Sequence, residues 1–326
     1  MSNKSSTIIT NYGTIVNNNY YGNNTENRTT TDNDTLYVID NDELSKFEKH
    51  KNYALSIQQI LYDYYKAIGK HTKAENIRTC GNFLLFRQYK NPEQTNKLML
   101  ANFCKHPLCP LCSWRKSLKN AKITHKTLKI VEKEEFLYLL TLTISNVNPI
   151  TKRIIRDLYQ NSKKFLDKRY YSKSYLSQFE ITYNPEREDY HPHIHLLFSS
   201  PMEHDTSENA IRKNNELWGG YYNQKYQITD IRPVEDVEKA SFELCKYLCK
   251  SPAISTTEAI TGIISPTTNL RQFNYAGLMR EARAEAKEIC TEEEELEIYN
   301  LSQYEYIEQI YSWITGQGYK KANNKI

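Results

Sequence analysis

One segment constrains the fold more than any other part of the chain, because its residues alternate between imidazole-bearing and apolar positions. It reads His191-Pro192-His193-Ile194-His195-Leu196-Leu197-Phe198. In a β-strand neighbouring side chains point to opposite faces, so the three histidines share one face, while Ile194, Leu196 and Phe198 share the other. The pattern predicts a strand with one face buried under a helix and the other face available for chemistry.

The histidines of this strand are candidate metal ligands. Two imidazoles two residues apart on a strand can bind one divalent cation, and we expect His193 and His195 to do so with His191 peripheral. Glu180, in the preceding predicted strand, supplies a third, anionic ligand if the two strands pair. Such a set suits Mn²⁺ or Mg²⁺ and leaves positions open for phosphate oxygens. The alternative is a set of ordinary surface or hydrogen-bonded histidines.

Neighbouring segments extend the strand to a sheet with flanking helices. Apolar runs and periodicity predict the following strands and helices: strands at 136–145, 176–183, 190–198 and 226–231, and helices at 43–69, 151–171, 208–218 and 235–250. From residue 136 onward the order is strand, helix, strand, strand, helix, strand, helix. This order fits a ferredoxin-like split β-α-β-β-α-β sheet plus one helix, and the predicted fold class is therefore α+β.

The last of these helices carries a candidate nucleophile. Its sequence at 243–250 is ELCKYLCK. Glu243 and Tyr247 are four residues apart and lie on one helical face, and Lys250 follows on the same side. A tyrosine hydroxyl can attack phosphorus, with Glu243 as a general base beside it. Because the chain has 26 tyrosines, an incidental surface tyrosine is the alternative.

Cysteines form a second candidate metal site. Cys104, Cys109 and Cys112 have the spacing Cys-x4-Cys-x2-Cys, which is typical of metal binding. Cys80 can complete a tetrahedral zinc set, and His106 is the competing fourth ligand. Buried free cysteines are the alternative.

Charge is unevenly distributed along the sequence. Residues 1–45 carry a net charge of −4, residues 46–280 carry +13, and residues 281–310 carry −8. A cationic middle indicates a polyanionic partner, with nucleic acid first among the candidates. The run after the cysteines predicts a phosphate-contacting helix face, for which a solvated face is the alternative: Arg115, Lys116 and Lys119, then Lys122, Lys126 and Lys129.

The ends of the chain have different compositions. Residues 1–40 are rich in Asn and Thr and are predicted to be a disordered tail. We expect a helical and zinc-knuckle DNA-binding segment at 41–130 and a C-terminal helical region of unassigned role at 253–326. The sequence contains no apolar run long enough for a membrane span and no signal-like start, and its seven cysteines do not suit a disulfide framework. We therefore expect a cytoplasmic protein.

Taken together, these segments resemble the plasmid rolling-circle replication initiators of Gram-positive bacteria, a branch of the HUH endonuclease superfamily. The resemblance is carried, in order, by ANFCKHPLCPLCSWRKSLK (101–119), FLYLLTLTIS (136–145), FEITYN (179–184), DYHPHIHLLF (189–198) and ELCKYLCK (243–250). It implies an RRM-like HUH nuclease sheet in a nicking domain at 131–252, behind an N-terminal zinc-binding segment.

The resemblance also implies roles for single residues. His193 and His195 hold Mn²⁺ or Mg²⁺, Glu180 falls on a further position of the family as the candidate third ligand, and Tyr247 is the nucleophile. Tyrosine attack leaves a 5′-phosphotyrosine and a free 3′-hydroxyl that primes a polymerase, and Glu243 promotes termination. The expected structural zinc ligands are Cys80, Cys104, Cys109 and Cys112, and the expected DNA contacts are Arg115, Lys116, Lys119, Lys246 and Lys250.

The implied partners are plasmid origin DNA, single-stranded at the nick, with a host helicase and polymerase; a dimer is left open. Three other functions compete with this interpretation. A relaxase or transposase would use the same chemistry. A histidine-triad nucleotide hydrolase nearly fits residues 191–197, although Pro192 suits that pattern poorly. A non-catalytic zinc-dependent DNA-binding protein would need residues 80–129 alone.

Overall fold

The computed structural model describes residues 41–245 and 256–322. The predicted tail at 1–40 lies outside the described residues. In the first part of the chain the structure has α2 (Asn41–Ala67), α3 (His71–Arg78), β1 (Phe83–Tyr89), β2 (Asn96–Ala101) and α4 (Pro110–Val131). The second part has β3 (Phe136–Thr143), α5 (Lys152–Tyr170), β4 (Tyr175–Asn184), β5 (Asp189–Ser200), α6 (Glu208–Gly220), β6 (Thr229–Pro233) and α7 (Val237–Leu244). The third has α8 (Thr257–Thr267), β7 (Phe273–Ala276), α9 (Leu278–Leu301), β8 (Tyr306–Ile314) and β9 (Gly318–Lys321).

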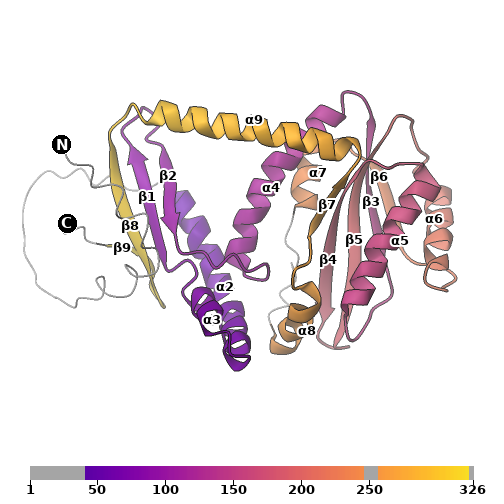
Figure 1. Cartoon of the computed structure of the whole chain (residues 1–326), viewed down its shortest axis with the longest axis horizontal. Coiled ribbons are helices and arrows are strands. Elements are labelled where there is room, and N and C mark those ends of the chain that lie inside the picture. Colours follow the sequence, from indigo (N-terminus) through magenta and orange to yellow (C-terminus); the bar gives the residue numbers. More distant parts are fainter. Residues whose placement is uncertain (1–40, 246–255, 323–326) are drawn as a thin grey trace, which may run out of the picture. The chain divides into compact units, whose positions relative to one another are not determined.

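The described chain is α+β, as predicted, and all its ladders between named strands are antiparallel. Five strands form one sheet in the order β6-β3-β5-β4-β7 (Figure 1). The first four strands of this order, with α5 and α6 as their connections, reproduce the predicted strand-helix-strand-strand-helix-strand succession. Strand β7 then adds to the edge of the sheet beside β4, which the sequence analysis did not foresee.

Alternation along the strands divides this sheet into two faces. On one face Leu140, Phe179 and Ile194 pack in a core with α5 and α6. On the other, here called the histidine face because His193 and His195 lie on it, leucines of β3, β4 and β5 pack against α4, α7 and α9. The sheet is therefore covered by helices on both sides, and the histidines lie beyond the end of the second cluster of apolar side chains.

Side-chain caps begin the helices around this sheet where the sequence offers Ser, Thr or Asp. Thr151 accepts a hydrogen bond from the backbone N–H of Ile154 at the start of α5, and Ser207 caps α6 in the same way. Asp236 accepts from Lys239 N–H at the start of α7. Such caps satisfy otherwise unpaired N–H groups, which explains why these helices begin within one or two residues of their predicted positions.

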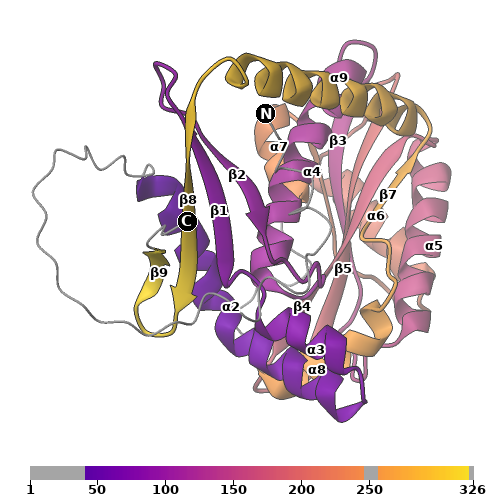
Figure 2. The same cartoon turned by 60° about the vertical axis from the view of Figure 1, so that its left-hand side comes forward.

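A second sheet joins distant parts of the chain. Its strand order is β2-β1-β8-β9, so β8 pairs with β1, which lies more than 200 residues earlier in the sequence, and β9 pairs with β8 (Figure 2). The region expected to be helical at 253–326 therefore also contains strands β7, β8 and β9, and the segment at 41–130 contains β1 and β2. The sequence analysis missed these five strands.

Helix α4 connects the cysteine segment to the five-stranded sheet. It begins immediately after Cys109, with Pro110 in its first turn, and its C-terminal residues Leu128 and Val131 pack on the histidine face. Two of its lysines pair with the acidic helix α9: Lys122 and Lys126 lie 3.2 and 2.5 Å from Glu293. Part of the charge asymmetry is therefore neutralised within the fold. Among the helices in the described ranges, none has the length and apolar character needed to cross a membrane.

Candidate functional site

Strand pairing brings Glu180 to the two histidines. Glu180 of β4 lies directly opposite His193 of β5 in the antiparallel register. The Oε2 atom of Glu180 is 3.6 Å from Nε2 of His193 and 3.2 Å from Nε2 of His195. Glu180 is 4 % exposed, and the two imidazoles are 15 % and 14 % exposed, so the carboxylate lies beneath two partly accessible rings.

The three residues suit a divalent cation. Their candidate ligand atoms all lie within 4.8 Å of one another. One carboxylate and two imidazoles on neighbouring strands form a donor set that Mn²⁺ accepts, and rigid strands hold the donors in place. A buried carboxylate also needs a compensating positive charge, which a bound cation would provide. The predicted triad is therefore brought together by the fold.

Thr141 is a residue of this site that the sequence analysis missed. It lies opposite His195 on β3, and its hydroxyl is 3.0 Å from Nδ1 of His195. Metal-binding histidines usually donate their second ring N–H to such a partner, which fixes the tautomer and leaves the other nitrogen free to bind the ion. Thr141 therefore directs Nε2 of His195 toward Glu180. Identifying Thr141 requires the register of β3 against β5, which the sequence alone does not give.

His191 belongs to the same strand face but not to the group of three ligands. Its ring centroid is 5.8 Å from that of His193, and the two rings are nearly perpendicular. Burial, followed by the neighbouring His193, lowers the pKa of His191. The strand opposite places Thr182 beside His191, so no carboxylate of β4 faces it.

Helix α7 leads toward the predicted nucleophile. Asp236 caps it, and Leu244 is fully buried against the histidine face. The Glu243 carboxylate forms an ion pair with Arg232 of β6 at 2.6 Å. Both side chains are partly exposed. Tyr247, Lys246 and Lys250 lie outside the described residues.

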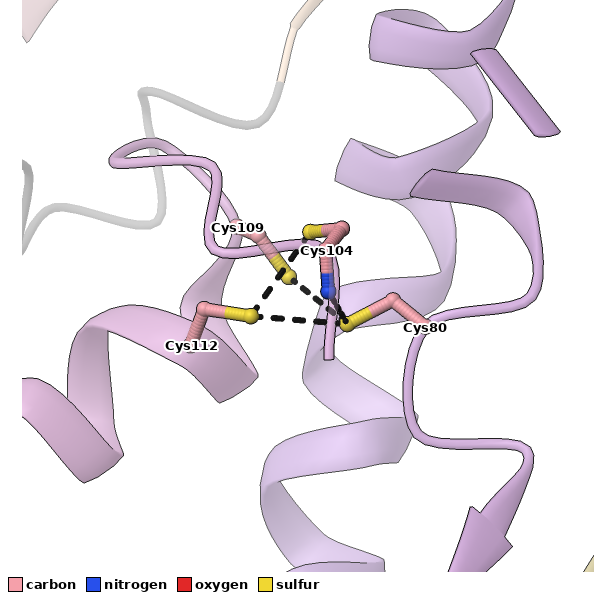
Figure 3. A group of neighbouring side chains, drawn as sticks. All are labelled: Cys80, Cys104, Cys109 and Cys112. Atoms are coloured by element: carbon pink, nitrogen blue, oxygen red, sulfur yellow. Dashed lines mark hydrogen bonds between the residues drawn. The ribbon is translucent and has the colours of Figure 1, made fainter. Parts of the chain in front are cut away.

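The four cysteines predicted to bind zinc come together (Figure 3). Cys80 follows α3, Cys104 and Cys109 lie in the loop before α4, and Cys112 is in the first turn of α4. The Sγ atom of Cys112 is 3.5 Å from that of Cys80 and 3.6 Å from that of Cys104, while Cys80 and Cys109 are 3.8 Å apart. Four sulfurs at these separations suit a single tetrahedral ion.

Hydrogen-bond donors surround the sulfur atoms. The backbone N–H groups of Cys104, Lys105 and His106 each point to a cysteine sulfur at 3.3 to 3.4 Å. The Gln58 amide donates to Cys109 Sγ at 3.4 Å. Such donors stabilise thiolates, which is the form in which cysteine binds metal. The sequence analysis did not identify Gln58.

His106, the competing fourth ligand, is engaged elsewhere. Its Nε2 is 3.0 Å from the Tyr65 hydroxyl, and its Nδ1 accepts the backbone N–H of Leu108 at 3.2 Å. Burial, followed by the charge of Lys73, lowers the pKa of His106 to about 4, so the imidazole is neutral at pH 7. The structure therefore groups Cys80, and not His106, with the other three cysteines.

The predicted DNA-contacting residues of α4 lie in different surroundings. The Arg115 guanidinium stacks over the Phe103 ring at 4.1 Å from its centroid, and Lys116 donates to the side chain of Gln272 at 3.3 Å. Lys119 is exposed. Lys122 and Lys126, in contrast, already pair with Glu293. The cationic surface of α4 is therefore restricted to its N-terminal half.

Comparisons with known proteins identify the family of this chain. A family described as "Replication protein" matches residues 95–320. A "Protein rep" of Streptococcus pneumoniae is 30 % identical over 243 residues, covering 68 % of this chain and 75 % of the relative. A "Protein rep" of Staphylococcus aureus is 33 % identical over 202 residues, 56 % of this chain and 86 % of the relative. A "Protein rep" of Lactiplantibacillus plantarum is 28 % identical over 263 residues, 71 % of this chain and 80 % of the relative.

No solved structure gives a significant match. The family match covers more than half of the chain and includes three of the four clustered cysteines, all except Cys80, together with the Glu180–His193–His195 group. The relatives come from Gram-positive bacteria, as the sequence resemblance implied. The chain therefore belongs to the replication protein family, that of the plasmid rolling-circle initiators.

Proposed function

We propose that this protein initiates rolling-circle replication by nicking one strand of plasmid origin DNA in a metal-dependent reaction. The observation that carries the proposal is the convergence of Glu180, His193 and His195 on a sheet face against which α7 packs. Tyr247 follows α7 by three residues in the sequence. Strand transfer by a tyrosine requires two components, a metal-binding group and a tyrosine nucleophile. Here the tyrosine follows, in the sequence, the helix that packs on the sheet face of the metal-binding group.

The topology supports an HUH nuclease fold for this sheet. Strands β3, β4, β5 and β6 with the crossover helices α5 and α6 give the split β-α-β arrangement that the resemblance implies. In that fold the paired histidines stand on a central strand. Here β5 lies between β3 and β4, with His193 and His195 on one of its faces.

The proposed reaction assigns a task to each residue. When bound to Glu180, His193 and His195, Mn²⁺ or Mg²⁺ would withdraw charge from the scissile phosphate. The Tyr247 oxygen forms a bond to phosphorus, the bond from phosphorus to the 3′ oxygen breaks, and the 3′ oxygen leaves as a hydroxyl with the tyrosine proton. The products are a 5′-phosphotyrosine and a 3′-hydroxyl primer, which a host helicase and polymerase extend.

Termination needs a second attack, for which we propose Glu243 as general base for water. The ion pair with Arg232 holds the Glu243 carboxylate on the β6 side of α7. Zinc, held by Cys80, Cys104, Cys109 and Cys112, is proposed to be structural, because all four positions of a tetrahedral ion would be occupied by protein. The cations at the start of α4, with Lys246 and Lys250, are proposed to contact origin DNA, which is single-stranded at the nick.

A covalent-adduct assay tests the proposal. The purified chain is incubated with labelled plasmid origin oligonucleotides and Mn²⁺ or Mg²⁺, and protein–DNA adducts are resolved on denaturing gels. Tyr247→Phe and His193→Ala should abolish the adduct, while the matched variant Tyr171→Phe, at a side chain that is 81 % exposed, should retain it. Adduct formation by Tyr247→Phe, or cleavage in excess chelator, would contradict the assigned roles.

A further inference from the structure

A cavity lies on the sheet face opposite the histidines. Its volume is about 520 Å³, and its walls come from α5, the start of β4, and the segment between α8 and β7. Ser177 belongs to the lining of this cavity. It lies three residues before Glu180 on β4, and because side chains alternate along a strand, the two point to opposite faces of the sheet. The cavity is therefore separate from the metal site described above.

The walls of this cavity are cationic. Lys152, Arg156 and Lys163 recur at spacings of four and seven residues on one face of α5, and Arg271 adds a fourth charge from the facing segment. No acidic side chain is among the lining residues. On α5 an ion pair joins Arg153 to Asp157, and within the described ranges none of the four lining cations forms one. Four cations without neutralising partners around one hollow favour an anionic ligand.

A buried hydroxyl in the same lining lacks a partner. Ser177 is 1 % exposed, and its Oγ has no hydrogen-bond partner within the described part of the chain. Leaving a buried hydroxyl without a partner costs free energy, so a ligand that reaches the cavity floor would gain by accepting or donating there. This observation is independent of the surface charges and points to a polar ligand.

The remaining lining has the chemistry that recognises a nucleoside. Tyr159 and Tyr175 contribute aromatic rings, and Asn269 and Asn274 contribute side-chain amides. The Tyr159 hydroxyl donates to the backbone carbonyls of Arg271 and Gln272 at 3.2 and 3.3 Å, which ties the far wall to α5. Aromatic rings stack on bases, amides pair with base edges, and cations bind phosphates.

We propose that this cavity binds one unstacked nucleotide of a single DNA strand, on the face of the sheet opposite the metal site. The exposed cations of α5 bind the phosphates on either side of that nucleotide, Tyr175 stacks on the base, and Ser177 supplies a buried hydrogen bond. A strand, rather than a free nucleotide, is favoured because Lys152 and Lys163 are eleven residues apart on α5 and together span more than one phosphate. The proposal rests on the proposed function only in taking DNA as the ligand.

Salt-dependent binding of fluorescent single-stranded oligonucleotides, without added metal, tests this site. The pocket variant combines Arg156→Ala and Lys163→Ala. The matched control combines Arg153→Ala and Lys164→Ala, which removes the same charge from the same helix outside the cavity lining. Log affinity decreases linearly with log salt, and the magnitude of this slope should be smaller by about 1.4 in the pocket variant, at about 0.7 for each lost phosphate contact. The slope should not change in the control.

Ser177→Ala separates the buried contact from general charge. Because the hydroxyl has no partner without ligand, this variant should fold as stably as the parent chain and lose severalfold in oligonucleotide affinity. An equal slope change in pocket and control variants, or unchanged affinity of Ser177→Ala, would overturn the proposal. Deoxynucleoside monophosphates that compete as well as the oligonucleotide, per nucleotide, would also overturn it by assigning the cavity to free nucleotides.

The metal site serves as an independent reference. Nicking of origin DNA with added Mn²⁺ or Mg²⁺ reports on that site separately, because the pocket lies on the other face and the binding assay contains no metal. If the parent chain fails to nick origin DNA but shows the Arg156-dependent and Lys163-dependent slope, the proposed function fails and the pocket stands. If nicking is present and the slope does not change, the pocket proposal fails alone.

Discussion

The hydroxyl of Thr141 gives a sharp test of how the metal site is built. Thr141→Val keeps the shape and β-branching of the side chain but removes the partner 3.0 Å from His195 Nδ1. The imidazole then loses the contact that fixes its tautomer, and one polar nitrogen loses its partner in a largely buried ring. Removing such an outer contact weakens metal binding by about 10- to 100-fold, which corresponds to about 1.4 to 2.7 kcal/mol.

Thr143 provides a matched control on the same strand. It lies opposite His193 in the same way that Thr141 lies opposite His195. The Nδ1 atom of His193 has no hydrogen-bond partner within the described residues, so the Thr143 hydroxyl does not bond to it. Thr143→Val should therefore bind Mn²⁺ as the parent chain does.

The assay is a titration with Mn²⁺ in the absence of DNA, in which the electron paramagnetic resonance signal of free Mn²⁺ reports the unbound fraction. Thermal unfolding of both variants checks that the sheet is intact. Equal Mn²⁺ affinity in Thr141→Val and the parent chain would refute the orienting role of Thr141. Equal weakening in both threonine variants would attribute the effect to a general disturbance of β3.

Three further outcomes follow from the described contacts. Cys80→Ser should lower the zinc content measured by mass spectrometry below one per chain, whereas His106→Gln should retain one zinc, because both ring nitrogens of His106 are already engaged. Glu243→Ala should slow termination by about 10²- to 10⁴-fold in a quench-flow assay and leave the first nick intact; its exposed pair with Arg232 should contribute less than about 1 kcal/mol to the free energy of unfolding. Glu293→Gln should release two lysines of α4 and raise duplex DNA affinity at low salt, as measured by anisotropy.

Local sequence patterns predicted four strands of the five-stranded sheet, all except β7, because the signals of these four are local. Strand β5 carries its alternation within twelve residues, and its neighbour β3 is a short, mainly apolar run bounded by polar segments. Caps at the following helices mark their first turns in the sequence. The predicted strand at 226–231 lies at 229–233, because Ile228 is 61 % exposed and Ile231 is buried.

The second sheet escaped prediction because its core contains polar side chains. On β8 the buried side chains include Gln309, which is fully buried and donates to the Gln88 side chain at 2.8 Å. Tyr311 donates its hydroxyl to Gln309 at 2.8 Å. A buried glutamine breaks the apolar alternation by which a strand is recognised, and its partner lies 221 residues away in the sequence. The pairing of Gln309 with Gln88 can therefore be recognised only in the folded structure.

The members of both candidate metal-binding groups could be named from residue type and spacing, whereas the residues around them could not. Histidines and cysteines are uncommon and are chemically specific, so a cluster of them stands out in the sequence. Thr141 and Gln58 are ordinary residues in a strand and a helix, and their roles depend on which segment lies opposite. The same holds for Lys51, which no sequence pattern distinguishes from the other lysines of α2.

Lys51 makes the charge of the cysteine cluster testable. It is 1 % exposed, and its ammonium donates to the Cys80 carbonyl at 2.6 Å and to the Gln58 side chain at 3.0 Å. Burial lowers the pKa of Lys51, and negative charge on the cysteines raises it. Four thiolates and one Zn²⁺ together carry two negative charges, so a buried ammonium beside them offsets part of that charge.

The direction of the change in stability in Lys51→Met therefore distinguishes two states of the cluster. If the cysteines bind zinc as thiolates, the substitution leaves a buried anionic centre without its cation, and the free energy of unfolding should fall by about 3 to 5 kcal/mol. If they are neutral thiols, the substitution removes a buried charge that lacks a counter-ion, and stability should stay unchanged or rise. Urea unfolding of the zinc-replete protein measures this difference, with Lys49→Met, at an exposed position of the same helix, as the control. A gain in stability for Lys51→Met beside an unchanged control would show that the cluster carries no net negative charge, and the zinc-thiolate assignment would fail.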